Sequence, residues 1–450
     1  MVAKHLSENA RGWLVTSIGS VLAGGHWLFE QCYSRGYDYF LWIYNAWLMG
    51  QSWGHWTNWS PFSAAGQPVF KMAGVSDALI MGLFIEGFGL DAGTRIYTLT
   101  LYIVAGTGMY SLGRLVSGSA LGGAVAANAY VFSWFISFTV YYQTYLSNFL
   151  LFSLLPWGAL WAVCGIVARS RGALVATTLV IFIGLTANAQ VAIKMVLFIV
   201  PFTWLFAVWW RKVSWRLWSV CTLLWGGGAL WLAGFVIVSS MALRDEIVLL
   251  GELRGNAFIP PWMTLFGIPL FGLNYFFYHI ADISWLDRDM LVWVIYSDYI
   301  GWSILVPVIA AWPMAWRSGQ SLVRAMFALL AFYALLYFVV VPHLQASAWI
   351  GRTHNWALLT TIALSLLAAC GAVYWTRRRT LAMRWRVGLA LCCAIALELG
   401  GVSFFLNRLG MTHTPLQDLP EVGIWRDLGA ADLSWPEGGR FFTFNPDHTF

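Results

Sequence analysis

Residues 356–376 read WALLTTIALSLLAACGAVYWT, and Arg377-Arg378-Arg379 follows directly. An apolar run of about 20 residues is long enough to cross the hydrocarbon core of a bilayer as an α-helix. Basic residues collect in the loops on the cytoplasmic side of a membrane. The stretch therefore predicts a membrane-spanning helix whose C-terminal end lies in the cytoplasm.

The composition of the whole chain points the same way. Of the 450 residues, 60% are apolar and only 10% are charged, and the mean hydropathy is +0.68. A soluble domain is about half apolar and about a quarter charged, so a soluble single-domain enzyme is excluded. A disordered chain is excluded as well, because disorder requires low hydrophobicity. The 29 tryptophans also favour a membrane protein, since Trp prefers the membrane–water interface.

Eleven stretches are long and apolar enough for spanning helices: 13–31, 94–116, 119–141, 149–168, 173–189, 193–210, 217–241, 291–314, 322–342, 356–376 and 387–406. With the N-terminus in the cytoplasm, fifteen of the 26 Lys and Arg residues fall inside, and nearly all acidic residues fall outside. This distribution fits the positive-inside rule. We therefore expect an all-α polytopic membrane protein of about eleven spans, N-in and C-out, with a retained first helix rather than a signal peptide.

This topology divides the chain into a membrane domain, 1–406, and a polar tail, 407–450. The membrane domain has two long outside loops, 32–93 and 242–290. The tail is rich in Pro and Gly and alternates over 440–444, which predicts the start of a strand. We interpret it as a tail or, if the chain is truncated, as the start of an extracytoplasmic domain.

Several classes of function find no support in the sequence. The net charge is +6, but no basic run interleaved with polar aromatics indicates a nucleic-acid surface. The six cysteines form no C-x-x-C pair, which argues against a zinc site or a disulfide framework. No metalloprotease, P-loop or Gly-x-Ser-x-Gly motif occurs. We expect no nucleic-acid partner, and no metal ligand can be named.

The first outside loop carries the most informative residues. Asp38 stands directly before 39–53, whose apolar residues follow the stripe of an amphipathic helix on the membrane surface. A short apolar stretch, 77–90, predicts a second interfacial or re-entrant helix. Asp38 is interpreted either as a helix N-cap or as a carboxylate with a pKa raised toward that of a general base. The two roles are compatible.

The loop resembles the polytopic GT-C glycosyltransferases, and in particular the bacterial YfhO-like group. The residues that carry the resemblance are Asp38, Trp47, Gly50, Trp59, Pro61, Phe62, Gly66, Pro68 and Phe70. The resemblance is specific over about 35–115 and generic elsewhere. It implies a plasma (inner) membrane enzyme that moves a sugar from a polyprenyl-phosphate donor to an extracytoplasmic glycan, lipid or protein. It also implies an inverting transfer with Asp38 as the base, on the extracytoplasmic face.

The donor phosphate requires cations, and arginine suits it because its guanidinium is planar and always charged. Arg352, in Gly351-Arg352-Thr353-His354, is the preferred phosphate contact, with an interfacial anchor as its alternative. Arg35 is either a second contact or the salt-bridge partner of Asp38. The remaining candidates for substrate binding are His354, Trp59, Gln67, Asp77 and Glu86.

Other acidic residues have alternative explanations. Asp77 stands at the start of the short apolar helix and could cap it. The adjacent Asp245 and Glu246 could hold a divalent cation, although a solvated loop explains them as well. Glu398 lies within the last span, too deep for a site on the outer face, so we expect it to make a structural hydrogen bond to a neighbouring helix.

Two other functions are compatible with the sequence. A secondary transporter would also have many spans, but neither an inverted repeat nor paired broken helices are visible. A catalytically silent membrane scaffold of the same fold is the other alternative, because fold does not fix function. A degenerate copy should lack Asp38, and this chain retains it.

Overall fold

The computed structural model describes residues 2–25, 33–34, 43, 46–47, 75–143, 146–242, 299–316, 320–340 and 356–412. Within them the chain is helical, apart from two short strands, β1 (Tyr33–Ser34) and β2 (Met411–Thr412), which pair antiparallel. The helices are α1 (Val2–Gly24), α4 (Val75–Phe88), α5 (Leu90–Ser117), α6 (Ala120–Val131), α7 (Trp134–Ser137), η2 (Phe138–Gln143), α8 (Leu146–Val167), α9 (Arg171–Ala187), α10 (Ala189–Thr203), η3 (Trp204–Trp210), α11 (Trp215–Ala242), α14 (Trp302–Trp316), α15 (Ser321–Leu335), η4 (Leu336–Val340), α17 (Ala357–Thr376) and α18 (Leu381–Gly410).

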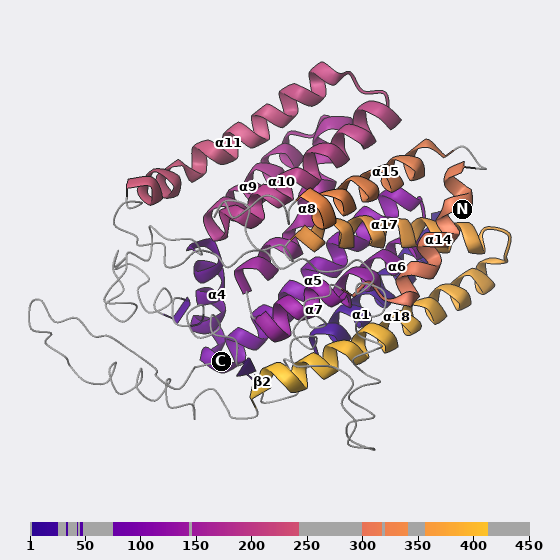
Figure 1. The fold of residues 1–450 in the computed structure, drawn as a ribbon, viewed down its shortest axis with the longest axis horizontal. Helices are drawn as coiled ribbons and strands as arrows, with labels where there is room; N and C mark the ends of the chain where they lie inside the picture. The colour runs from indigo at the N-terminus through magenta and orange to yellow at the C-terminus, as the bar shows by residue number, and fades with distance from the viewer. Residues whose placement is uncertain are drawn as a thin grey trace, which may run out of the picture.

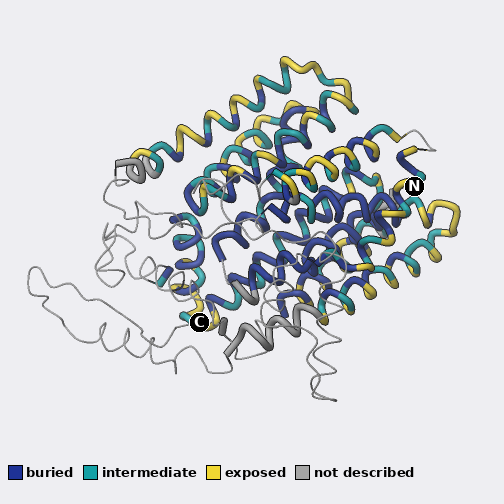
Figure 2. The backbone as a smooth tube through the Cα atoms, in the orientation of Figure 1, coloured by how far each residue is buried: buried dark blue, intermediate teal, exposed yellow. Residues whose placement is uncertain are grey.

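The bundle is built around α5, α6, α8 and α17 (Figure 1). α6 packs against α1, α5, α17 and α18, and every residue of α6 is buried. α11 lies at the periphery, where it packs mainly on α9 and leaves Leu223 and Trp231 exposed (Figure 2). An apolar surface of this kind is suited to lipid rather than to water.

Among the described residues, five helical segments are long and apolar enough to cross a membrane: 120–140, 146–167, 189–210, 215–234 and 357–376. Three shorter apolar helices, α9, α14 and α15, lie beside them. The prediction of a multi-pass, all-helical membrane protein is therefore confirmed. Each of the eleven predicted ranges overlaps a helix, but the number of spans and their direction across a membrane stay predictions.

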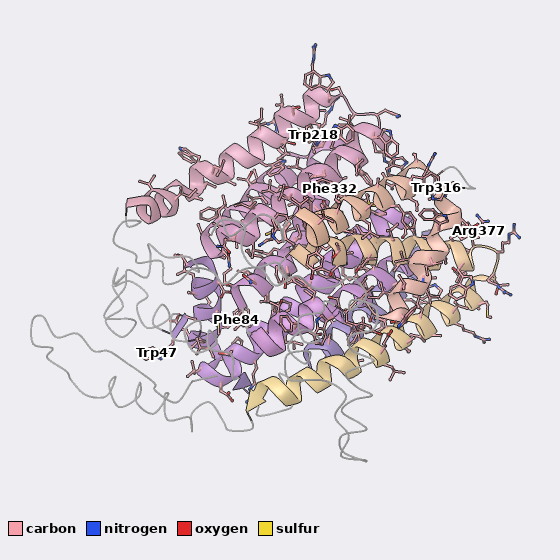
Figure 3. All side chains as sticks on the ribbon, viewed as in Figure 1. Trp47, Phe84, Trp218, Trp316, Phe332 and Arg377 are labelled. Atoms are coloured by element: carbon pink, nitrogen blue, oxygen red, sulfur yellow. The ribbon has the colours of Figure 1, made fainter. Side chains whose placement is uncertain are left out.

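The two ends of the bundle carry different residues (Figures 1 and 3). We call one end the α4 end: it holds α4, the starts of α5, α8, α10, α14 and α17, and the ends of α1, α9 and α18. We call the other the arginine end, because Arg114, Arg169, Arg171, Arg211, Lys212, Arg216, Arg324, Arg377, Arg378, Arg379, Arg384 and Arg386 lie there. Arg384 is partly buried and the others are exposed. Trp47 and Phe84 mark the first end in Figure 3, and Trp316 and Arg377 mark the second.

Glycines allow two central helices to approach closely. A Cβ atom added to Gly371 of α17 would lie 1.7 Å from the carbonyl oxygen of Pro307 in α14, so only glycine fits there. The sequence also suggests close packing or a kink at Gly226-Gly227-Gly228. The prediction of close packing is wrong for Gly226 and Gly227, because no atom lies within 4 Å of a Cβ added to either. A Cβ added to Gly228 would lie 3.2 Å from Thr178. The reason is that α11 is peripheral and has few helical neighbours.

The two helices predicted in the first outside loop are described to different extents. The short apolar helix is present as α4, although it begins at Val75, two residues before the predicted start. It packs against α5, α8 and α9. Of the predicted amphipathic helix 39–53, the structure describes Ile43, Ala46 and Trp47, which are helical. Ile43 and Ala46 are buried, as expected for one face of a helix.

Candidate functional site

Most of the predicted site residues lie outside the described part of the chain. These are Asp38, Arg35, Arg352, His354, Trp59 and Gln67, together with the acids of the second long loop and the strand expected over 440–444. The described elements that flank them in sequence nevertheless share one end of the bundle. β1 ends four residues before Asp38, and α17 begins just after His354. Both elements belong to the α4 end.

Asp77 is buried and anchors α4 to the bundle. Its side chain is fully buried, and one carboxylate oxygen accepts a hydrogen bond from the Tyr97 hydroxyl of α5. The helix begins two residues earlier, so Asp77 lies in its first turn and does not occupy the N-cap position expected for it. Burial raises the pKa of this carboxyl to about 7, and the Tyr97 hydrogen bond opposes that rise. Glu86, the other predicted residue on α4, is exposed.

Polar side chains connect α4 to the neighbouring helix ends. The Ser76 and Thr186 hydroxyls share a hydrogen bond between α4 and the end of α9. Asn188 then caps α10, because its side-chain oxygen accepts from the backbone N–H groups of Gln190 and Val191. Its amide nitrogen also donates to the Asn148 side-chain oxygen at 2.8 Å, which fixes the start of α8. These bonds hold four helices in register at the α4 end.

Lys194 of α10 is the buried cation of the α4 end. Its side chain is only 1% exposed, and its Nζ has no hydrogen-bond partner among the described residues. Nζ lies 5.5 Å from the ring centroid of Trp356, a distance at which a cation interacts with an aromatic ring. Trp356 stands at the start of α17, directly after the sequence that contains Arg352 and His354.

Glu398 of α18 holds the start of α14. Its carboxylate accepts hydrogen bonds from the Tyr299 hydroxyl at 2.7 Å and from the backbone N–H groups of Trp302 and Ser303 at 2.8 Å each. The first N–H groups of a helix have no partner within the helix, so the carboxylate acts as a cap supplied by another helix. The prediction that Glu398 makes a structural hydrogen bond to a neighbouring helix is confirmed.

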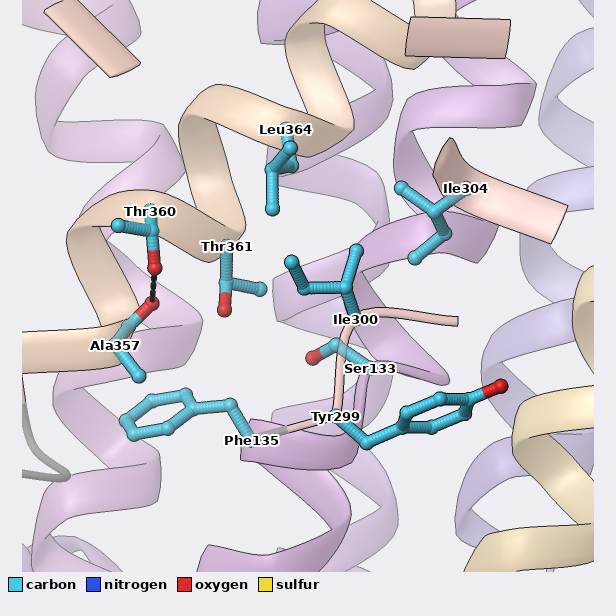
Figure 4. Close-up of a pocket in the computed structure, with 9 residues that line it drawn as sticks. All are labelled: Ser133, Phe135, Tyr299, Ile300, Ile304, Ala357, Thr360, Thr361 and Leu364. Atoms are coloured by element: carbon cyan, nitrogen blue, oxygen red, sulfur yellow. Dashed lines mark hydrogen bonds between the residues drawn. The ribbon is translucent and has the colours of Figure 1, made fainter. Parts of the chain in front are cut away.

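A small pocket lies beside this cap (Figure 4). Tyr299, Ile300 and Ile304 form one wall, and Ser133, Phe135, Ala357, Thr360, Thr361 and Leu364 complete the lining. The hydroxyls of Ser133 and Thr361 point into it, whereas Thr360 donates back to the Ala357 carbonyl at 2.8 Å. The free space is only about 20 Å³, which suits a water molecule between these hydroxyls rather than a sugar.

No cluster of His, Cys, Asp or Glu suited to a metal ion occurs among the described residues. Within that same part of the chain, one ion pair joins Arg95 to Asp91 at 3.2 Å, one turn apart on α5. Asp91 is half exposed, whereas the Arg95 side chain is only 12% exposed. The described chemistry of the α4 end is therefore hydrogen bonding and charge.

Comparison with known proteins identifies the fold. No family model matches the chain, and no curated protein matches it. The chain is similar to the cryo-EM structure of arabinofuranosyltransferase AftD from Mycobacteria, with a TM-score of 0.55 and 16% sequence identity. The match covers 92% of this chain and 28% of the AftD chain, so this chain spans less than a third of the length of that protein. The match shows a shared fold and agrees with the GT-C-like fold expected from the first loop. Membership of the YfhO-like group stays a prediction.

Sequence reasoning found some of these residues and missed others. Asp77 and Glu398 were recognised, because a carboxylate in an apolar segment needs an explanation. Lys194 stands at the outer end of the predicted span 193–210, a position that by itself gives no reason to expect a site. Trp356 and the Asn148–Asn188 pair gave no sequence signal, because isolated Trp and Asn residues near helix ends are common in membrane proteins.

Proposed function

We propose that this protein is a membrane glycosyltransferase of the GT-C kind, which moves a sugar from a polyprenyl-phosphate donor to an extracytoplasmic glycan, lipid or protein. The observation that carries this proposal is the fold shared with an arabinofuranosyltransferase over 92% of the chain. The membrane domain, 1–406, would carry the activity, and 407–450 would be an extracytoplasmic tail or the start of an extracytoplasmic domain. Arabinofuranosyl donors are the first to test, because AftD is named for that sugar.

The positive-inside rule supports a direction for the bundle. The described arginines collect in short connections at the arginine end, and such loops stay in the cytoplasm. The α4 end then faces outward, in agreement with eleven spans, N-in and C-out. The first-loop helices and the start of α17 would form the site on that face of the plasma membrane.

The proposed reaction is an inverting displacement. The Asp38 carboxylate takes the proton of the acceptor hydroxyl as the acceptor oxygen forms a bond to the anomeric carbon. The bond from that carbon to the phosphate oxygen breaks, and polyprenyl phosphate leaves with the electron pair.

Arg352 would stabilise the leaving phosphate, with Arg35 or His354 as a further contact. Trp59 and Gln67 would hold the sugar, and Asp77 and Glu86 would support the loop. A divalent cation could also bind the phosphate oxygens at this site.

Sugar transfer by the purified protein tests the proposal. We expect Asp38→Asn to reduce transfer from a polyprenyl-phosphate sugar by about 100-fold or more, because the base is lost. Asp91→Asn is a matched control, because Asp91 is a half-exposed carboxylate that pairs with Arg95 one turn away on the same helix. It should transfer like the wild type. Equal transfer by Asp38→Asn and the wild type, at equal expression, would contradict the mechanism.

Lipid binding separates the glycosyltransferase from its alternatives. The wild type and Asp38→Asn should bind polyprenyl phosphate equally, whereas Arg352→Ala should bind it more weakly because a charged phosphate contact is lost. Binding without transfer to any acceptor would favour the silent scaffold. If the wild type binds no such lipid, the likeness is one of fold only, and the transporter moves ahead.

A further inference from the structure

The ammonium group of Lys194, which has no hydrogen-bond partner within the described residues, is the feature that needs an explanation. The side chain is 1% exposed, and within the described chain neither a carboxylate nor a hydrogen-bond acceptor contacts its Nζ. The two buried or half-buried carboxylates of the α4 end have other partners. Asp77 is bound by Tyr97, and Glu398 caps α14.

A buried charge without a counter-ion destabilises a fold, because it loses its hydration and gains nothing in return. A methionine would fill the same space in α10 without that cost. Intramembrane ionisable residues are therefore functional by default, and the expected partner of an ammonium group is an anion. The face of Trp356 attracts the cation only weakly compared with a full counter-charge.

The position of Lys194 selects the kind of anion. α10 starts at the α4 end, where Asn188 fixes its first turn against α8 through Asn148. Lys194 lies five residues after the start of α10, and Trp356 joins it to the start of α17. An anion bound there sits at the end of the membrane domain, where the polar group of a lipid lies rather than its chain.

We propose that Lys194, with Trp356 beside it, forms an anion subsite that binds the phosphate group of a lipid-linked substrate. The inference rests on the proposed function and assigns its phosphate contact to a residue inside the bundle, in addition to Arg352 in the loop. Lysine binds phosphate as a point charge with three donors, so a single phosphate oxygen can replace the missing hydration. The lysine is a binding residue with no part in proton transfer.

Thermal unfolding of the full chain in detergent, with and without added ligand, tests this subsite. The variants are Lys194→Met and Lys194→Gln, and the control is Lys212→Met, which removes an exposed lysine at the arginine end. The ligands are polyprenyl monophosphate, the uncharged polyprenol and inorganic phosphate. The dissociation constant for polyprenyl monophosphate is measured on each variant by titration.

Replacing Lys194 should affect stability and ligand binding in opposite directions: the unfolding temperature without ligand should rise, and binding of the ligand should weaken. Without ligand, Lys194→Met should unfold at a higher temperature than the wild type, because an uncompensated charge is removed. Polyprenyl monophosphate, but not polyprenol, should stabilise the wild type, and both variants should bind it about tenfold more weakly or worse. Lys212→Met should behave as the wild type. Inorganic phosphate could stabilise the wild type to a smaller extent and leave Lys194→Met unchanged. That result would also support the subsite, and it would show that a free anion binds there without a lipid chain.

Two results would overturn the inference, and they differ in what they leave standing. If the wild type binds polyprenyl monophosphate and Lys194→Met binds it equally well, the subsite is wrong while the proposed function stands. The same holds if both variants unfold earlier than the wild type or fail to fold, because the lysine is then a structural residue. If the wild type binds no polyprenyl phosphate, the proposed function falls together with the subsite.

Discussion

The two ends of the bundle handle charge in different ways. At the arginine end, almost all of the basic side chains are exposed, and Arg211 and Arg377 lie over the rings of Trp210 and Tyr374. At the α4 end, Asp77 and Lys194 are buried, and each has its own specific environment. An exposed charge stays hydrated and changes the free energy of folding little. A buried charge destabilises the fold unless it is paired or binds a ligand. The first pattern is the one expected of cytoplasmic loops, and the second is the basis of the proposed anion subsite.

This difference predicts where substitutions are felt most. Removing a buried charge at the α4 end should leave its partner group without a hydrogen bond or remove a ligand contact, which lowers stability or binding. Removing one at the arginine end should return a solvated side chain to water at almost no cost. Three predictions test this contrast.

Glu398→Ala should have the largest effect on stability. The substitution leaves two backbone N–H groups of α14 and the Tyr299 hydroxyl without their acceptor. We expect a loss of about 2 kcal/mol, because the site is half-buried and water can replace part of the carboxylate. Glu398→Gln, which keeps one acceptor oxygen, should lose less. Thermal unfolding of the two variants beside the wild type measures the difference. Equal losses would contradict this ranking and show that the charge and the second oxygen carry the whole cap.

The sequence predicts the elements of the α4 end better than their contacts. The depth of Glu398 in an apolar segment was enough to predict a structural hydrogen bond, because no other fate suits a carboxylate there. Asp77 was misplaced as a cap, since the local pattern of an Asp before an apolar run cannot show that Tyr97, 20 residues later, returns to meet it. The burial of Lys194 depends on the packing of α8 and α9 against α10 and on Trp356 at the start of α17, which no local pattern contains.

The pH dependence of stability should report on Asp77. α4 is too short to cross a membrane, and the pKa of its buried carboxyl rises from 3.8 to about 7. A folded-state pKa above the unfolded value stabilises the protein fully below the unfolded pKa, and this stabilisation is lost as the pH rises through the folded pKa. The unfolding temperature of the wild type should therefore fall between about pH 4 and pH 7, relative to Asp77→Asn. Parallel curves for the two proteins would show that Asp77 does not carry a proton in the fold.

Tyr97→Phe is the matched control for that measurement. The variant removes the hydroxyl that stabilises the ionised carboxylate, so the pKa of Asp77 should rise further. The loss of stability should then extend to higher pH than in the wild type. A shift to lower pH would contradict the assigned hydrogen bond.

Arg378→Gln should have the smallest effect. Arg378 is exposed in the short connection between α17 and α18, where its side chain is already hydrated. We expect its loss to change stability by less than about 0.5 kcal/mol, because exposed charges gain little in the folded state. Binding of polyprenyl phosphate should be unchanged, since the residue lies at the opposite end of the bundle from Lys194. If Arg378→Gln is as costly as Glu398→Ala, the contrast between the two ends is wrong. The arginine end would then carry a specific interaction of its own, and the orientation inferred from it would lose its simplest explanation.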